Sequence, residues 1–223
     1  MKLLKVSQFL TWPISYAYFN IFFRLKINDR ENLKKVNRPF IIIANHFSFA
    51  DSFIFRLILG FSTPHLPLRF MAVNRFDWKW LNFLSEIGVI SFIYSLFGVF
   101  IVVPGQGLQK NLEEAKRLIS EGENIVIYPE GKIVSEHEVA PFKLGAAVLA
   151  SQTGAPVLPI SMHLGQKGLL RRGLTIHIGE PIHVSYDALP EATTTLFYDT
   201  IVGLCDKGQE RDKKKHRYSG ALN

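Results

Sequence analysis

The stretch IIIANHFSFADSF, residues 41–53, indicates the fold class and contains the first candidate site. Its isoleucines, Ile41 to Ile43, are β-branched and suit a strand that is buried on both faces. His46 comes directly after this strand, and open α/β sheets bind their ligands at strand ends. Asp51 precedes a run of helically spaced apolar residues, so we expect it at the start of a helix. The stretch therefore predicts a strand, a polar loop and a helix.

The spacing of His46 and Asp51 suggests a paired imidazole and carboxylate. A carboxylate in this position holds an imidazole in one tautomer and is favoured by the helix dipole. The spacing alone is weak, because a solvated surface pair would look the same. The position between a strand and a helix, with Asn45 beside the histidine, favours a functional pair.

Composition limits the classes of protein that the chain can belong to. Its 223 residues suit one large α/β domain. The 18 phenylalanines and the net charge of +7 fit contact with an anionic membrane better than with nucleic acid, because the basic residues are not interleaved with aromatic ones. Cys205 is alone, which excludes an intrachain disulfide and a zinc site built on cysteines. The spacing of the histidines matches no familiar metal site, so we expect no metal.

The N-terminal segment is the clearest membrane signal. Between Lys5 and Arg24 lie 18 uncharged residues, VSQFLTWPISYAYFNIFF, a length that is marginal for spanning and suits an interfacial helix. The alternative is an ordinary buried N-terminal helix. We expect residues 1–30 to form a membrane-associated helical segment, residues 31–205 the main domain and residues 206–223 a basic C-terminal tail.

Strands and helices are expected to alternate along the chain. Strands are predicted at Phe40–Ala44, Phe70–Val73, Val99–Val103, Asn124–Tyr128, Val157–Ser161 and Leu174–Ile178. Helices are predicted at Asp51–Leu59, from about Trp78 to Phe97, and at Leu108–Ser120 and Phe142–Ser151. This alternation predicts a single α/β domain with a largely parallel or mixed central sheet flanked by helices.

A second polar cluster follows another predicted strand, in NIVIYPEGK at residues 124–132. Glu130, Gly131 and Lys132 follow the strand, and glycine lets backbone amides approach a ligand closely. Lys143 opens the next helix and adds a second cation. The same residues would also suit a polar surface turn. Two clusters at strand ends of one sheet can meet in one crevice, so we expect them to form one site.

Four segments occur in the order and approximate spacing of a known family. They are Asn45-His46-x4-Asp51, Tyr128-Pro129-Glu130-Gly131, Phe142-Lys143-x-Gly145-Ala146 and Ala155-Pro156-Val157-Leu158-Pro159-Ile160. Together they resemble the glycerolipid acyltransferase family, which includes the lysophosphatidic acid (1-acylglycerol-3-phosphate) acyltransferases. The resemblance covers about residues 40–185.

The resemblance implies a membrane-bound enzyme of phospholipid synthesis. It would move a fatty acyl group from acyl-CoA or acyl carrier protein, as donor substrate, to a hydroxyl of a lysophospholipid, without a cofactor. His46 would be the general base and Asp51 would orient it. Asn45, Glu130 and Gly131 would then serve substrate binding. Membrane phospholipids would be partners, nucleic acid would not, and the cytoplasmic face of a membrane would be the location.

Two departures from the family pattern keep other functions open. Pro104 stands about where the family often has an arginine, and the third motif reads Glu130-Gly131-Lys132-Ile133, where an arginine is also common. From their chemistry, Lys132 and Lys143 would supply charge for a phosphate. The third motif is similar to that of tafazzin, so a CoA-independent transacylase is one alternative. A non-catalytic membrane scaffold on the same fold is another.

Overall fold

The computed structural model describes residues 2–48, 50–60, 65–73, 88–103, 105–135, 138–167 and 170–219. In chain order the elements are α1 (Lys2–Phe22), β1 (Phe23–Asn28), the 3-10 helix η1 (Arg30–Lys35), β2 (Ile41–Ala44), α2 (Asp51–Leu59), β3 (Leu68–Val73), α4 (Val89–Phe97), β4 (Val99–Val102), α5 (Leu108–Ser120), β5 (Asn124–Ile127), α6 (Gly145–Thr153), β6 (Val157–Lys167), β7 (Arg172–Ile178) and α7 (Pro190–Ser219).

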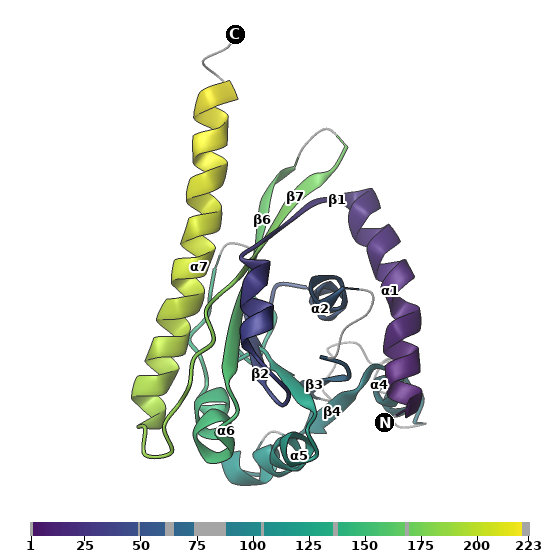
Figure 1. The fold of residues 1–223 in the computed structure, drawn as a ribbon, viewed down its shortest axis with the longest axis vertical. Helices are drawn as coiled ribbons and strands as arrows, with labels where there is room; N and C mark the ends of the chain where they lie inside the picture. The colour runs from purple at the N-terminus through teal and green to yellow at the C-terminus, as the bar shows by residue number, and fades with distance from the viewer. Residues whose placement is uncertain are drawn as a thin grey trace.

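The strands of the described residues form one seven-stranded sheet in the order β1-β7-β6-β2-β5-β3-β4. Every neighbouring pair is parallel except β6 and β7, which are antiparallel. Helices cover both faces of this sheet (Figure 1). The sequence-based prediction of an α/β domain with a largely parallel or mixed sheet is therefore confirmed.

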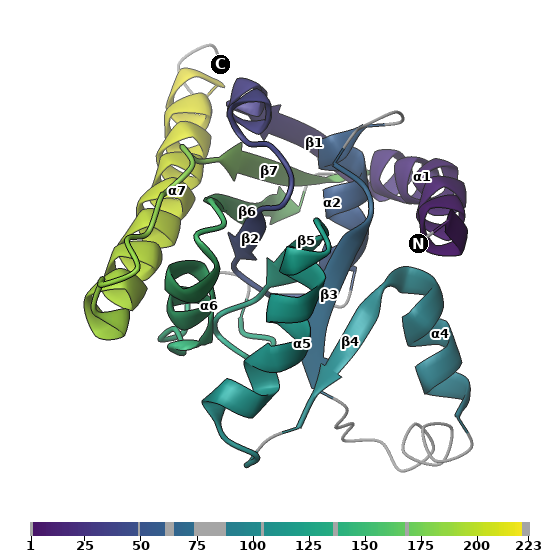
Figure 2. The same cartoon turned by 60° about the horizontal axis from the view of Figure 1, so that its bottom comes forward.

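The central strand β2 shows why the sheet is covered on both sides. Ile42 packs in the core layer that contains α2 and the inner face of α1, and Ile41 and Ile43 pack in the layer that contains α5, α6 and α7. All three isoleucines are 0% exposed. Figure 2 shows α5, α6 and α7 on one side of the sheet and α1 and α2 on the other. A strand with alternating contacts to both layers has no polar face, as the run of isoleucines requires.

Strand β1 was not expected from the sequence. It pairs with β7 from Phe23 opposite Arg172 to Asn28 opposite His177. Its segment FRLKIN alternates apolar and polar residues, which is the period of a half-buried strand. Because an apolar run precedes it, the segment was assigned to the expected N-terminal helix. The expected boundary at residue 30 therefore lies after a strand of the main sheet.

Helix α7 continues through the boundary that was expected at residue 206. It runs without interruption from Pro190 to Ser219, so the backbone of the expected basic tail up to residue 219 belongs to this helix. Its N-terminal half packs on the sheet through Phe197 and Ile201, which are 1% and 0% exposed. The predicted helix at about Trp78–Phe97 falls partly outside the described residues, and its described part is α4.

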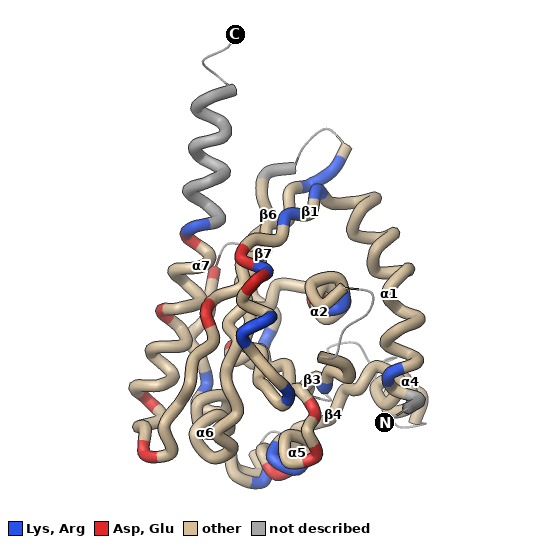
Figure 3. The backbone as a smooth tube through the Cα atoms, in the orientation of Figure 1, with Lys and Arg blue, Asp and Glu red and all other residues tan. Residues whose placement is uncertain are grey.

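Helix α1 has one face against the domain and an apolar face toward the outside. Leu4, Gln8, Ser15 and Phe19 are buried. The exposed large apolar residues of α1 are Val6, Phe9, Leu10, Ile14, Tyr16, Tyr18, Ile21 and Phe22. Most of the helix carries no charged residue (Figure 3). Across the described residues, none of the helices is both long enough and apolar enough to cross a membrane.

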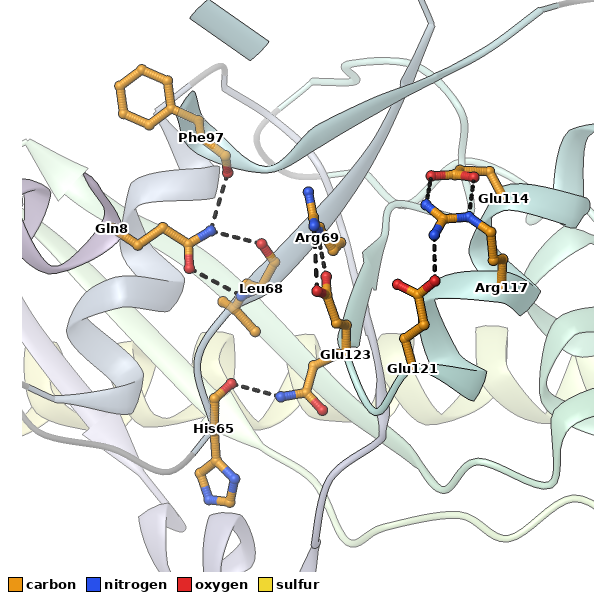
Figure 4. Close-up of polar contacts among 10 residues, drawn as sticks. Gln8, His65, Leu68, Arg69, Phe97, Glu114, Arg117, Glu121 and Glu123 are labelled. Carbon is orange, nitrogen blue, oxygen red and sulfur yellow. Dashed lines mark hydrogen bonds and ion pairs between the residues drawn. The ribbon is translucent and has the colours of Figure 1, made fainter. Parts of the chain in front are cut away.

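Gln8 joins α1 to the sheet (Figure 4). Its side-chain amide accepts a hydrogen bond from Leu68 N at 3.0 Å and donates to Leu68 O at 2.7 Å and Phe97 O at 3.1 Å. The pairing of β3 with β4 begins only at Phe70, so Gln8 fills the backbone hydrogen-bonding position that a longer β4 would occupy. These hydrogen bonds connect α1 to β3 and to the end of α4.

Candidate active site

His46 lies in the loop that leads from β2 into α2, and Asp51 is the first residue of α2. β2 ends at Ala44 and α2 begins at Asp51, so the pair occupies the strand-to-helix junction that the sequence predicts. His46 Nδ1 lies 3.0 Å from Asp51 Oδ2. The side chain of Asp51 is 1% exposed and that of His46 is 16% exposed. The structure therefore brings together a buried carboxylate and an accessible imidazole.

The Asp51 carboxylate also organises the loop itself. Its Oδ2 accepts hydrogen bonds from the backbone N–H groups of Phe47 and Ser48, each at 2.9 Å. An ionised carboxylate only accepts hydrogen bonds, so His46 Nδ1 must donate to it. In the neutral imidazole Nε2 is then the nitrogen without a proton, and this tautomer is the one that can take a proton at Nε2.

Asn45 contacts the neighbouring strand. Its amide Nδ2 donates to Met162 O at 2.9 Å, and its Oδ1 accepts from Met162 N at 2.8 Å. The residue is 4% exposed. Both ends of the amide thus extend the pairing of β2 with β6 beyond the end of β2. In this structure Asn45 fixes the strand end that carries His46.

Glu130 connects three loops. Its Oε1 accepts a hydrogen bond from His46 N and its Oε2 accepts one from Ala140 N, both at 3.0 Å. The residue is 2% exposed. Burial raises the pKa of the Glu130 carboxyl above its ordinary value, and the two backbone hydrogen bonds partly offset this effect. Glu130 therefore holds the backbone of His46, and its side chain is not among those that line the cavity described below.

Gly131, Lys132 and Lys143 form the edge of the site opposite α2. Gly131 has φ +66°, a left-handed conformation that favours glycine. Lys143 N donates to Pro129 O at 2.9 Å, which fixes the approach to α6 against the loop after β5. The side chains of Lys132 and Lys143 are exposed and line the same cavity as His46. The two clusters that the sequence separates by about 80 residues thus meet at one crevice.

A cavity of about 730 Å³ begins at these residues and extends between α1, α2, α4 and β3. His46, Lys132 and Lys143 contribute polar side chains to its lining, which also includes Gly131. The other polar or aromatic-hydroxyl residues of the lining are Gln8, Thr11, Ser52, Arg56, Tyr94 and Tyr128. Its apolar lining consists of Phe53, Leu66, Leu68, Phe70, Met71, Ala72, Ile93, Phe97, Val99 and Ile133. A cavity of this composition suits a ligand that has both a polar group and a hydrocarbon portion.

Sequence reasoning missed several residues that the structure places here. Tyr128 stacks on His46, and Ser52 and Arg56 line the cavity from α2. Ser52 and Arg56 are four residues apart on α2, so helical spacing was the available signal that they share one face of the helix. Gln8 reaches the cavity from α1, for which the sequence held no signal because the contact is long-range.

Among the described residues, Cys205 and the possible metal ligands do not add a nucleophile or a metal site to the residues around His46. Burial raises the pKa of the Cys205 thiol to about 12, so it is protonated at neutral pH and is a poor nucleophile. Within the described ranges, no three His, Cys, Asp or Glu side chains are grouped so that they could hold a metal ion. Pro104, where the family pattern led us to look for an arginine, lies outside the described residues.

Comparison with known proteins finds acyltransferases. The family model described as Acyltransferase matches residues 24–163. A 1-acyl-sn-glycerol-3-phosphate acyltransferase of Chlamydomonas reinhardtii is 31% identical over 173 residues, which are 76% of this chain and 48% of that protein. A tafazzin of Dictyostelium discoideum is 28% identical over 148 residues, 64% of this chain and 50% of that protein. This chain spans about half the length of the curated relatives it matches.

The fold has a counterpart among solved structures. The crystal structure of the 1-acyl-sn-glycerophosphate acyltransferase PlsC from Thermotoga maritima superposes with a TM-score of 0.58 at 24% sequence identity. The superposition covers 90% of this chain and 79% of that one. At this identity the likeness shows a shared fold, and it includes most of the elements described above.

Proposed function

This chain belongs to the Acyltransferase family, and from that premise we propose that it transfers a fatty acyl group from an acyl thioester to the hydroxyl of a lysophospholipid. The resemblance seen in the sequence motifs is thereby confirmed at the level of the family. The observation that carries the proposal is the buried carboxylate of Asp51 against His46 in the lining of a largely apolar cavity. Acyl-CoA and acyl carrier protein are the two donors proposed.

In the proposed reaction, His46 Nε2 takes the proton of the acceptor hydroxyl as its oxygen attacks the thioester carbonyl carbon. Asp51 keeps the imidazole in the required tautomer and stabilises the imidazolium that forms. The carbon–sulfur bond of the tetrahedral intermediate then breaks, and the thiolate leaves as the imidazolium returns its proton to sulfur. The new ester and the free thiol balance the reaction, and no covalent intermediate with a protein nucleophile is required.

The proposed acceptor carries a phosphate. Lys132 and Lys143 line the same cavity as His46, and their ammonium groups suit a phosphate. Glycerol-based acceptors place the reacting hydroxyl close to the phosphate, so cations and base must be near each other. The apolar lining of the cavity is then available for acyl chains. Lysophosphatidic acid is the acceptor proposed first, because 1-acyl-sn-glycerol-3-phosphate is the substrate in the names of the relatives.

We also propose that α1 and α4 rest on the membrane that supplies the acceptor, at its cytoplasmic face. The outer face of α1 exposes Leu10 and Ile14 at 63% and 70%, and α4 exposes Phe92 at 64%. Both helices also line the cavity. Contiguous exposed apolar side chains of this kind indicate an interface with lipid or protein. A Leu10→Asn, Ile14→Asn variant should bind vesicles containing anionic lipid more weakly, and an Asn20→Ala variant of the same helix should not.

The function is tested by acyl transfer from labelled acyl-CoA or acyl carrier protein to lysophosphatidic acid and, in parallel, to other lysophospholipids. His46→Ala should remove the product, and His183→Ala, which changes an exposed histidine outside the cavity lining, should leave it unchanged. Product from the His46→Ala protein equal to that of the unchanged protein would overturn the proposed role. A His46→Ala variant that retains full biological activity would instead favour a scaffold.

The second candidate function is transacylation between a phospholipid and a lysophospholipid. The observations that favour it are the similarity to the Dictyostelium tafazzin and a lysine, Lys132, after Glu130-Gly131. The same base would activate the same hydroxyl, with an oxygen ester in place of the thioester. Product that forms from two lipids when the thioester is omitted, and that depends on His46, would select this reaction.

A further inference from the structure

Tyr128 covers one face of the His46 ring. The two ring centroids are 3.9 Å apart and the ring planes differ by 16°, so the phenol ring lies flat on the imidazole. Asp51 contacts the edge of the same imidazole at Nδ1, 3.0 Å away. The imidazole is therefore held in two independent directions, at its edge by a carboxylate and on its face by an aromatic ring.

Tyr128 is itself held by α2. Its hydroxyl oxygen lies 3.4 Å from Ser52 Oγ, and its ring packs against Phe55 with centroids 6.2 Å apart. Asp51, Ser52 and Phe55 belong to the same helix. Consequently α2 carries the edge partner of His46 and contacts its face partner.

The phenol of Tyr128 is not a competing base at neutral pH. Burial raises the pKa of Tyr128 strongly, and the nearby charge of Asp51 raises it further. The phenol therefore stays protonated and does not take the acceptor proton in place of His46. The geometric observation is the position of its ring on the imidazole face.

Resting on the proposed function, we infer that Tyr128 is a positioning residue that fixes the His46 imidazole by face stacking, so that Nε2 stays directed at the acceptor hydroxyl. A ring that is held only at Nδ1 can still rotate about that hydrogen bond, and each such rotation moves Nε2 away from the reacting proton. Small misplacements of a catalytic group cost large factors in rate. The π face also attracts the imidazolium that forms in the reaction.

Tyr128 also lines the cavity, so contact with substrate is the competing role. The two roles differ in what they change. A substrate contact acts on KM, whereas a positioning contact acts on kcat and on the state of the imidazole in the free protein. The mobility of the His46 ring in the free protein, read from the ¹³C relaxation of its Cδ2–H and Cε1–H bonds, depends on positioning and requires no substrate.

The experiment compares Tyr128→Phe, Tyr128→Leu and Tyr128→Met with the unchanged protein. Phe197→Leu is the matched control, because Phe197 is 1% exposed on α7 in the opposite core layer. The Leu and Met variants should lower kcat about tenfold or more with KM within about threefold, and ¹³C relaxation should show a more mobile His46 ring. Tyr128→Phe should restore both the rate and the ordered ring. Two variants without an aromatic ring guard against one that fails to fold.

Two results would overturn the inference. One is a His46 ring whose mobility is unchanged in both non-aromatic variants. The other is a loss confined to KM, or no larger than that of Phe197→Leu. The proposed function is judged separately: if the unchanged protein transfers no acyl group while the mobility of the His46 ring still responds to Tyr128, the positioning role stands and the proposed reaction fails.

Discussion

The side chain of Lys143 crosses directly over the backbone of Gly131. A Cβ built on Gly131 would stand 2.5 Å from Lys143 Nζ and 2.8 Å from its Cε, closer than non-bonded atoms approach. Gly131 also has φ +66°, where any side chain is strained. Two features therefore favour glycine at position 131. The backbone has a left-handed conformation, and the space beside it is occupied by the Lys143 side chain that lines the cavity.

Gly131→Ala should weaken acceptor binding by displacing Lys143. The KM for an anionic lysophospholipid should rise about tenfold, the size of one lost charge-assisted contact. The measurement is steady-state acyl transfer with the acceptor concentration varied.

Gly154→Ala is the control for backbone strain, since Gly154 has φ +64° but nothing within 4 Å of a Cβ. Both variants should lose about 1–2 kcal/mol of stability, and only Gly131→Ala should change KM. Adding Lys143→Ala to Gly131→Ala should have no further effect on KM. A further large rise in the double variant would show that Gly131 acts independently of Lys143.

Asp51→Asn should reduce kcat by about a hundredfold or more, because the imidazolium that forms loses its carboxylate. The new amide must place its oxygen where Oδ2 accepts three hydrogen bonds. Its NH₂ then replaces Oδ1, a buried atom without a hydrogen-bond partner among the described residues, so stability should fall by about 1–3 kcal/mol. Kinetics and urea unfolding measure the two effects, and Asp187→Asn, an exposed carboxylate, should change neither.

Glu130→Gln should destabilise the protein by about 1–3 kcal/mol. Glutamine has one side-chain oxygen, so one of the two N–H groups, from His46 or Ala140, loses its acceptor and faces another donor. Urea unfolding monitored by circular dichroism measures this loss. Glu180→Gln, at a side chain that is 69% exposed, should have a much smaller effect.

The destabilisation caused by Glu130→Gln should depend on pH. The folded-state pKa of Glu130 is raised above its ordinary value near 4.5, so the folded protein binds this proton more tightly than the unfolded chain. The contribution to stability is therefore complete below the unfolded pKa and is lost as pH rises through the folded pKa. The stability difference between the unchanged protein and Glu130→Gln should shrink as pH rises from about 4.5. A difference that grows over this range would contradict the prediction.

Gln8→Ala should loosen α1 from the sheet. It leaves Leu68 N, Leu68 O and Phe97 O without the amide that they contact, at a cost of about 2–3 kcal/mol. Asn20→Ala is the matched control, because the amide of Asn20 donates only within α1, to Tyr16 O, among the contacts described. Its cost should stay below about 0.5 kcal/mol. Equal losses from the two variants would mean that the Gln8 side chain does not help to hold α1.

The locally encoded elements were predictable from the sequence. α2 at Asp51–Leu59 and α5 at Leu108–Ser120 begin and end where the apolar spacing places them. In both helices the spacing of the apolar residues that pack on the sheet is contained within the helix itself. β1 was missed because its alternation is short and follows an apolar helix, so its identity as a strand depends on β7, about 150 residues further along.

Hydrophobic periodicity and the end of a buried strand are local properties, so the α/β fold class and the position of His46 and Asp51 at a strand-to-helix junction could be predicted from the sequence. The residues that surround this pair follow from long-range strand pairing. Glu130 and Tyr128 reach His46 because β5 pairs with β2. The order of the strands in the sheet depends on how all strands and helices pack together and bury their apolar side chains. No short segment of the sequence contains this information.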